Sequence, residues 1–282
     1  MKGISKYWNK ISSHSFLPIL VASPAIFFSC QEPDPFPIIP EIQFNNIQFV
    51  ELLENGNPDS LILSFDFQDG DGDLGVEGDE TFPPFHDFNF VVDNNNRIVT
   101  FGQEDVELPF YLFVPDPFQP TRSLFSETDN RPSFDCGDYD TLYINEEKDR
   151  YIPPGVSFGD IDLEVFQKDT VYIQRNPYKS NIIIKFFRKR GIEEYEEIDW
   201  RYLTSQYGCG ISFDGRFPVL DFETVSSSGP LEGTIRYSMV STGFRTVLRK
   251  DTFNIRFQII DRGLHGSNVA ETGDITLDQL IR

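Results

Sequence analysis

The apolar segments of this 282-residue chain are short and have no helical period, and this feature most limits the folds that the chain can adopt. Stretches rich in Phe, Ile, Val and Tyr alternate with clusters of Asn, Asp, Gly and Pro, which is typical of antiparallel strands separated by turns. We therefore expect an all-β antiparallel sandwich, because no βαβ alternation is present. The candidate strands are 43–50, 60–68, 87–93, 97–102, 109–114, 140–144, 162–173, 181–188, 192–199, 217–221, 232–239, 251–260 and 273–278.

Turn residues refine this pattern. Asp93–Asn96 should form a tight turn, since Asn tolerates left-handed backbone, and Arg188–Gly191 should form a second one. Residues 192–203 could instead form a short helix, because their apolar alternation is imperfect. Residues 115–140 are rich in Pro, Asp, Ser and Asn and predict a long loop or insertion. The body is then either one sandwich with a long insertion near 76–175 or two sandwich lobes.

Two segments far apart in the chain share one pattern. Residues 59–69 (DSLILSFDFQD) align without gaps to 251–261 (DTFNIRFQIID), with Phe65 matching Phe257 and an Asp closing each segment. One interpretation is common strand patterning. The other is that they are the second and penultimate strands of an immunoglobulin-like sandwich, in opposite sheets and running in the same direction. The loops that follow them would then lie at one end of the molecule.

The first of these segments runs directly into an acidic, glycine-rich loop. Asp69, Asp71 and Asp73 are spaced at every second residue, and the glycines between them permit a tight backbone on which the carboxylates converge. Three converged anions repel one another unless a cation joins them. Ca²⁺ takes six to eight oxygen ligands, whereas Mg²⁺ demands a stricter geometry. The loop predicts a calcium site, and the alternative is a solvated acidic turn.

Further ligands are expected downstream of this loop. Glu77 and Glu80 fall at positions 9 and 12 of an EF-hand-like count, but Leu74 replaces the glycine required at position 6, so an EF-hand is not predicted. Glu77, Asp79 or Glu80 could still contribute oxygens. In the sandwich topology, Asp261 would approach the loop and complete or orient the site.

The N-terminus has the composition of a secretory signal peptide. Residues 1–15 are basic and polar, and residues 16–29 are apolar, uncharged and too short to span a bilayer as a helix. Phe27–Cys30 resembles the lipobox of bacterial lipoproteins, although Phe27 stands where such boxes usually have Leu. The resemblance implies that Cys30 is lipidated and becomes the N-terminus, and the alternative is an ordinary secreted protein.

Three parts are expected: a signal peptide at 1–29, a proline-rich acidic tether at 30–40 and the body at 41–282. The acidic residues after Cys30 resemble the surface-export signal of Bacteroidota lipoproteins. Residues 261–268 and 272–277 resemble the last loop and strand of immunoglobulin-like and fibronectin-type modules in bacterial surface proteins. Together with the acidic loop, the whole chain resembles a Bacteroidota lipoprotein family. This implies a β-sandwich at the outer membrane, on its periplasmic face or the cell surface, but no activity.

Net charge and cysteines limit the partners. Three lysines precede residue 30, so the remaining chain carries 21 basic and 45 acidic side chains, a net charge of −24. This excludes a basic nucleic-acid footprint and leaves membrane attachment to a lipid anchor. Cys136 and Cys209 favour a disulfide in an exported protein, the alternative being two free thiols.

Catalytic motifs are absent: the sequence contains no HExxH, no P-loop, no Rossmann glycine pattern and no nucleophile elbow. We therefore expect no enzyme, although 45 acidic residues leave a carboxylate-pair hydrolase open. The preferred function is a calcium-binding lipoprotein that acts as a binding or structural module for an unknown protein or glycan. The alternative is a glycan-binding accessory of a polysaccharide-uptake system, with tyrosines as stacking platforms.

Overall fold

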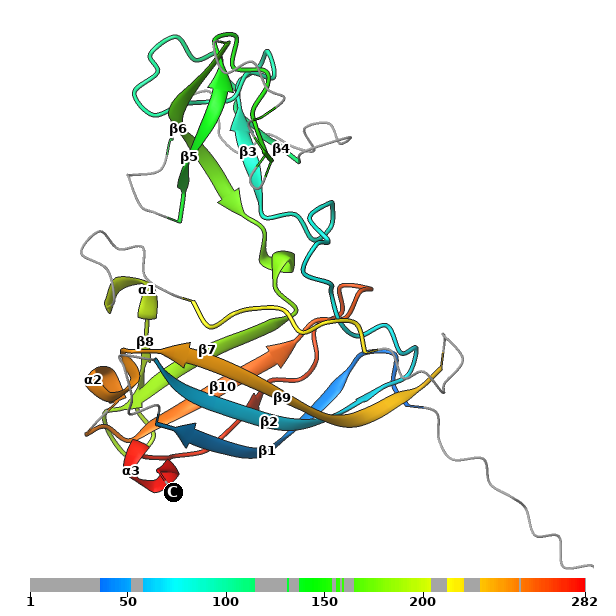
Figure 1. Cartoon of the computed structure of the whole chain (residues 1–282), viewed down its shortest axis with the longest axis vertical. Helices are drawn as coiled ribbons and strands as arrows, with labels where there is room; N and C mark the ends of the chain where they lie inside the picture. The colour runs from blue at the N-terminus through cyan, green and yellow to red at the C-terminus, as the bar shows by residue number, and fades with distance from the viewer. Residues whose placement is uncertain are drawn as a thin grey trace, which may run out of the picture. The chain divides into compact units, whose positions relative to one another are not determined.

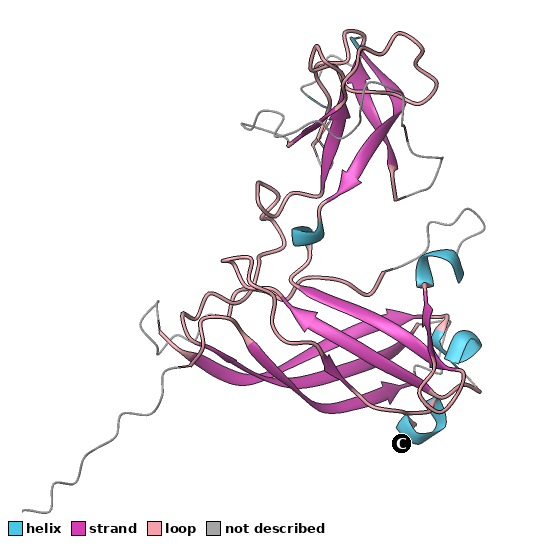
Figure 2. Ribbon diagram, turned by 180° about the vertical axis from the view of Figure 1, so that it is seen from behind, coloured by secondary structure: helices cyan, strands magenta, loops and turns pink. Residues whose placement is uncertain are grey.

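The structure is a computed structural model that describes residues 36–51, 58–114, 131, 137–153, 156–157, 159, 165–203, 212–220, 229–248 and 250–281. These residues form a mostly β fold with three antiparallel sheets (Figures 1 and 2). Two of the sheets contribute to one shared hydrophobic core, which makes a sandwich. The predicted all-β sandwich class is confirmed.

The sandwich consists of a three-stranded and a four-stranded sheet. Their strand orders are β1–β2–β9 and β11–β10–β7–β8. With the strands inserted between β2 and β7 set aside, these are the orders A-B-E and G-F-C-C′ of an immunoglobulin-like sandwich. The bounds are β1 (Glu41–Val50), β2 (Asp59–Asp69), β7 (Ile182–Lys189), β8 (Tyr195–Ile198), β9 (Leu231–Ser241), β10 (Phe253–Ile259) and β11 (Ala270–Glu271).

The strands β2 and β10 are the central frame of the sandwich. Each lies between two neighbours in its own sheet, and β2 alternates buried and partly exposed residues along its length. The rings of Phe65 and Phe257 are fully buried and meet between the sheets, with centroids 5.2 Å apart. The aspartates that follow in each segment, Asp69 and Asp261, also lie together. The two strands therefore run in the same direction in opposite sheets, as the internal similarity predicted.

Short helices complete the sandwich core. They are α1 (Trp200–Leu203), α2 (Phe244–Leu248) and α3 (Leu277–Leu280). Trp200, Phe244 and Leu277 are all buried, so each helix contributes an apolar side chain. Residues 192–203, for which strand and helix were both predicted, contain β8 followed by α1.

A separate lobe is inserted between β2 and β7. It contains β3 (Phe88–Val92), β4 (Tyr111–Phe113), β5 (Tyr139–Asn145) and β6 (Phe166–Arg175) in the order β4–β3–β6–β5. Phe90 belongs to one small apolar cluster and Val91 to another. Because successive side chains of a strand point to opposite faces, the sheet has a core on each face. We call residues 88–175 the inserted lobe.

The predicted turn at Asp93–Asn96 is present. The backbone N–H of Asn96 donates to the carbonyl of Asp93 at 3.0 Å, and Asn96 has a left-handed φ of 61°. The candidate strand 97–102 that follows it is not formed as a strand. Its backbone hydrogen bonds are divided among three neighbouring stretches of chain, residues 91–93, Lys148 and residues 170–172, so no continuous ladder develops.

Two further candidate strands are not strands. In the candidate 217–221, the described residues 217–220 form no strand. Their backbone bonds are irregular and go to the backbone of Leu74 and Val76 and to the side chains of Glu77 and Asn181. In 273–278, Ile275 forms a single bridge to Phe253, and the chain then enters α3 after the capping residue Thr276. In both segments the apolar pattern arises because side chains are buried. No strand forms, because neither segment has a partner strand of matching length among the described residues.

Several predicted features lie outside the described residues. These are the signal peptide, Cys30, most of the tether and the cysteines Cys136 and Cys209. Most of the predicted loop at 115–140 lies outside them too. Within the described part of the chain, no helix has both the length and the apolar character needed to cross a bilayer.

Candidate metal centre

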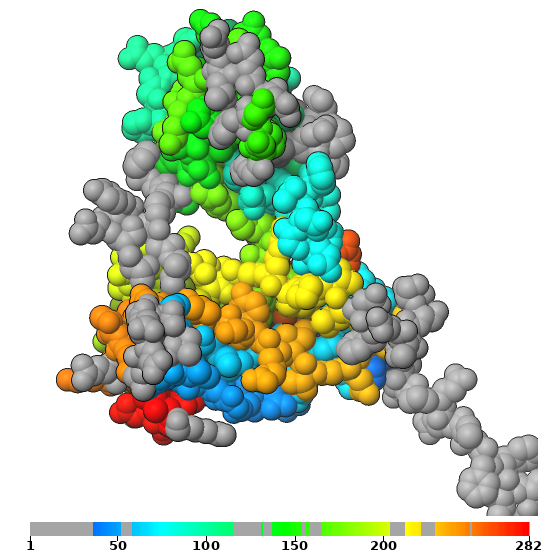
Figure 3. Space-filling model, viewed as in Figure 1, coloured from blue at the N-terminus to red at the C-terminus, as the bar shows by residue number. Residues whose placement is uncertain are grey.

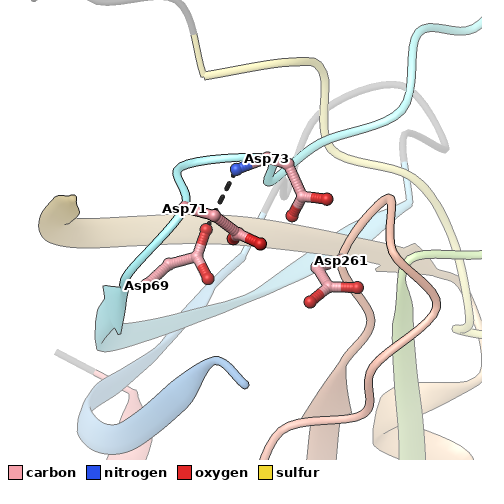
Figure 4. A group of neighbouring side chains, drawn as sticks. All are labelled: Asp69, Asp71, Asp73 and Asp261. Carbon is pink, nitrogen blue, oxygen red and sulfur yellow. Dashed lines mark hydrogen bonds between the residues drawn. The ribbon is translucent and has the colours of Figure 1, made fainter. Parts of the chain in front are cut away.

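Four aspartates converge at the end of the sandwich where β2 and β10 finish (Figure 4). Asp69 is the last residue of β2, Asp71 and Asp73 lie in the loop after it, and Asp261 follows β10 by two residues. One carboxylate oxygen from each lies within 4.8 Å of those from the other three. The structure thus brings together the three predicted loop residues and Asp261.

Glycines allow the loop to take this path. Gly72 and Gly75 have φ angles of +71° and +104°, a region that side chains disfavour. A Cβ at Gly72 would lie 2.2 Å from the carbonyl oxygen of Gly229, and one at Gly75 would lie 2.3 Å from that of Pro218. Leu74 between them is fully buried in the sandwich core. Leu74, which stands at position 6 of the EF-hand count, therefore packs into the core. This packing explains why a leucine replaces the glycine that an EF-hand requires.

Asp69 is one of two fully buried carboxylates in the group, with Asp261. Its side chain is fully buried, and its Oδ2 accepts a hydrogen bond from the backbone N–H of Asp73 at 3.1 Å. Its Oδ1 has no hydrogen-bond partner within the described ranges, and the buried Oδ1 of Asp73 has none either. Leaving an ionised oxygen buried without a partner is costly. A cation held by these oxygens would remove that cost.

Electrostatics within the group agree with this geometry. Burial and the neighbouring charges of Asp71, Asp73 and Asp261 raise the pKa of Asp69 to about 7. Burial, with the charges of Asp261 and Asp71, also raises the pKa of Asp73. Both carboxyls therefore resist ionisation when no cation offsets their repulsion.

Asp261 is held in place by a local turn. Its Oδ1 accepts from the backbone N–H of His265 at 2.7 Å, and its Oδ2 lies 2.9 Å from the Nδ1 of the same residue. The hydrogen bond and charge of Asp261 raise the pKa of His265. His265 lies in the loop that was predicted for this end of the molecule, but its contact with Asp261 was not predicted.

The structure does not bring the glutamates into the group. An oxygen of Glu77 accepts from the backbone N–H of Val219 at 3.2 Å. Glu80 forms a two-pronged ion pair with Arg262, at 2.7 and 2.9 Å. Asp79 is exposed. Beyond Gly75 the chain leaves the aspartates and runs along the 217–220 segment, so the even spacing that predicted further ligands does not continue.

Comparison with protein-family models, curated proteins and solved structures found no match to this chain. The chemistry of the site must therefore be argued from its own residues. Four carboxylates offer up to eight oxygens, and the group contains no sulfur or imidazole ligand. Such a donor set suits hard divalent cations rather than zinc or copper.

Proposed function

We propose that this protein binds Ca²⁺ at Asp69, Asp71, Asp73 and Asp261 and that the ion stabilises the sandwich. The observation that carries the proposal is the fully buried Asp69, a member of the group of four, whose Oδ1 has no hydrogen-bond partner in the described chain. A cation is the ligand that would satisfy that oxygen. Because it binds only the folded state, it would raise the free energy of unfolding.

Calcium is favoured over magnesium by the way the ligands are supplied. Three aspartates come from one loop and the fourth from another, and Asp71 is exposed to solvent. Ca²⁺ accepts irregular arrangements of six to eight oxygens, including water, whereas Mg²⁺ needs near-ideal octahedral geometry. A site assembled from two separate segments suits the irregular coordination of Ca²⁺ better than the octahedral coordination of Mg²⁺.

We also propose that the protein is a non-enzymatic lipoprotein of the outer membrane that acts as a binding or structural module. The support is the signal-like N-terminus, the lipobox-like Phe27–Cys30 and the net charge of −24 beyond residue 29. A body with that charge has little affinity for anionic lipid, so acyl chains on Cys30 would supply the anchoring.

The burial of two aromatic candidates favours this role over that of a glycan-binding accessory. Trp200 and Tyr139 are each only 4% exposed. Neither ring has an open face for stacking on a sugar. The cationic groups of Lys189 and Arg256 lie 5.9 and 5.6 Å from the ring centroid of Tyr195, and its hydroxyl donates to Asp274. Tyr202 is the exception, because it is 53% exposed. Binding of the calcium-loaded protein to a polysaccharide array would revive the glycan alternative.

The test is calorimetric titration of Ca²⁺, with Mg²⁺ as the comparison, into chelator-treated protein. We expect selective Ca²⁺ binding and a higher melting temperature, with about 2.7 kcal/mol of added stability at 100 times the Kd. The double variant Asp71→Asn/Asp73→Asn should lose at least about tenfold in affinity, or roughly 1.4 kcal/mol. Asp79→Asn removes a nearby charge outside the group and is the matched control. If the double variant keeps its affinity and stability, the calcium site is wrong.

A further inference from the structure

We propose that ion binding at the four-aspartate site tightens the junction through which the inserted lobe joins the sandwich. This inference rests on the proposed calcium site and adds a regulatory role to it. The junction is defined as residues 74–87, which lead into the inserted lobe, residues 176–181, which lead out of it, and residues 212–220, which lie against both. Figure 3 shows the incoming segment in cyan against the yellow 212–220 segment.

Arg262 connects the ion site to the incoming segment. It directly follows Asp261, and its backbone N–H donates to the carbonyl of Asp73 at 3.2 Å. Its guanidinium bonds both carboxylate oxygens of Glu80 and lies 5.4 Å from the centre of the Phe85 ring. A single residue thus contacts one ligand loop through its backbone and the junction through its side chain.

Arg216 joins the incoming and outgoing segments of the junction. Its guanidinium donates to the backbone carbonyls of Glu77, Glu80 and Phe85 in the incoming segment, at 3.0, 2.8 and 2.5 Å. It also donates to the carbonyl of Lys179 in the outgoing segment, at 2.5 Å. Four carbonyls from two segments therefore depend on one side chain, and that geometry holds only if the incoming segment stays in place.

Asn176 forms a second connection between the incoming and outgoing segments. Its side-chain amide donates to the carbonyls of Pro84 and His86 at 2.6 and 2.8 Å. The side chain of Asn181 pairs with the backbone of Phe217 in both directions, at 2.9 Å each. The junction thus combines these polar contacts with buried apolar side chains at its sandwich end, Leu74 and Phe217 among them. The polar contacts between the incoming and outgoing segments are the part that can open locally.

The ion would act by bringing the two ligand loops together. Without it, Asp69, Asp73 and Asp261 repel one another across the gap between the loops. Separation of the loops would carry Arg262 away from Glu80 and release the incoming segment. With the ion bound, the loops are fixed, and the Arg262 contact to Glu80 is held with them. The inserted lobe is then attached firmly only in the ion-loaded protein.

Hydrogen exchange of the full chain, with and without saturating Ca²⁺, tests this inference. We expect exchange in 77–86 and 176–181 to slow by about tenfold or more on ion binding, because local opening becomes rarer. Strand β5 within the inserted lobe is the internal control and should change little. Arg262→Gln should still bind Ca²⁺ by calorimetry but lose the protection of the junction. Arg245→Gln, which removes an arginine from a different ion-paired cluster, should behave as the wild type.

The outcomes separate the two proposals. If calorimetry shows Ca²⁺ binding but exchange in the junction does not change, the coupling is wrong and the calcium site stands. If the junction of Arg262→Gln remains protected by Ca²⁺, the route through Arg262 is wrong. If no Ca²⁺ binds, the proposed function fails, and this inference fails with it.

Discussion

At the scale of single residues, Asp69 combines complete burial with a carboxylate oxygen that has no hydrogen-bond partner in the described part of the chain. Buried carboxylates are normally paired or hydrogen-bonded, because desolvation of the charge is expensive. At Asp69 this desolvation cost lowers the stability of the folded protein when no cation is bound. Asp69 lies at the end of a core strand. The stability of the fold therefore depends on neutralisation of the four aspartates, either by a cation or by protons.

We predict that the calcium-free protein loses stability as the pH rises from about 4 to about 7. Since the pKa of Asp69 is raised to about 7, the folded state keeps a proton in this window that the unfolded chain has released. Stability then falls with pH, by at most about 1.4 kcal/mol per pH unit for one proton. The raised pKa of Asp73 acts in the same direction. The raised pKa of His265 adds to the decline only above about pH 6.5, where the unfolded side chain loses its proton first. The lowered pKa of Glu80 acts oppositely, but only below its ordinary range.

Chemical denaturation in chelator at a series of pH values measures this dependence. Asp69→Asn should flatten the profile, whereas Asp79→Asn should keep it. Saturating Ca²⁺ should abolish the decline, because the ion binds the ionised carboxylates, and its affinity should fall below pH 7 for the same reason. A calcium-free protein whose stability stays constant or rises across this window contradicts the prediction.

The sequence indicated the ligands of the candidate site better than their surroundings. The spacing of Asp69, Asp71 and Asp73 shows in one short segment, and Asp261 could be added because its strand repeats the pattern of the first. The roles of Arg262 and Glu80 could not be predicted, because an ion pair between residues far apart in the chain leaves no local pattern. Glu80 was expected only as one possible further ligand, and in the folded chain it pairs with Arg262 instead.

At the scale of elements, the predictable strands are those with continuous partners. Long strands such as β2 and β9 pair over eleven residues each, so their apolar alternation matches their ladder. Segments 97–102 and 273–278 carry similar patterns, but their backbone bonds go to several neighbours or end at a helix cap. Burial produces the alternation, whereas a strand also requires a partner of matching length, which a single sequence does not reveal.

Strand β7 contributes the centre of the aromatic core. Phe186 is fully buried, and its ring centroid lies 5.2 Å from those of both Trp200 and Phe213. We predict that Phe186→Ala lowers the free energy of unfolding by about 3–5 kcal/mol, through lost burial and the cavity left behind. Phe82→Ala is the control, because that side chain is 72% exposed and its removal should change stability by less than about 0.5 kcal/mol.

Urea denaturation of both variants in saturating Ca²⁺ gives the comparison, and the ion keeps the metal site from contributing to the difference. Equal losses in the two variants would contradict the assignment of Phe186 to a closely packed centre. A change in the slope with urea would indicate that the variant altered the unfolded or native ensemble rather than packing alone.

At the scale of the whole molecule, the charge of the body and the proposed anchor complement each other. A net charge of −24 beyond residue 29 opposes approach to anionic headgroups, so the proposed lipid anchor on Cys30 would have to supply any attachment to a membrane. Acyl chains contribute about 0.8 kcal/mol for each buried CH₂, and two chains suffice for stable anchoring. The proline-rich stretch after Cys30 would hold the body away from the bilayer.

We therefore predict that Cys30→Ser abolishes membrane attachment while leaving the body folded. In cells that process lipoproteins, the wild-type protein should enter the detergent phase on phase partitioning, and its N-terminal peptide should carry the mass of an acylated cysteine. The Cys30→Ser protein should remain in the aqueous phase or keep its signal peptide. Cys136→Ser removes a cysteine outside the lipobox-like segment and should stay anchored. If wild-type protein partitions into the aqueous phase with an unmodified Cys30, the anchor is wrong. The same protein must then reach its partners as a secreted, strongly acidic module.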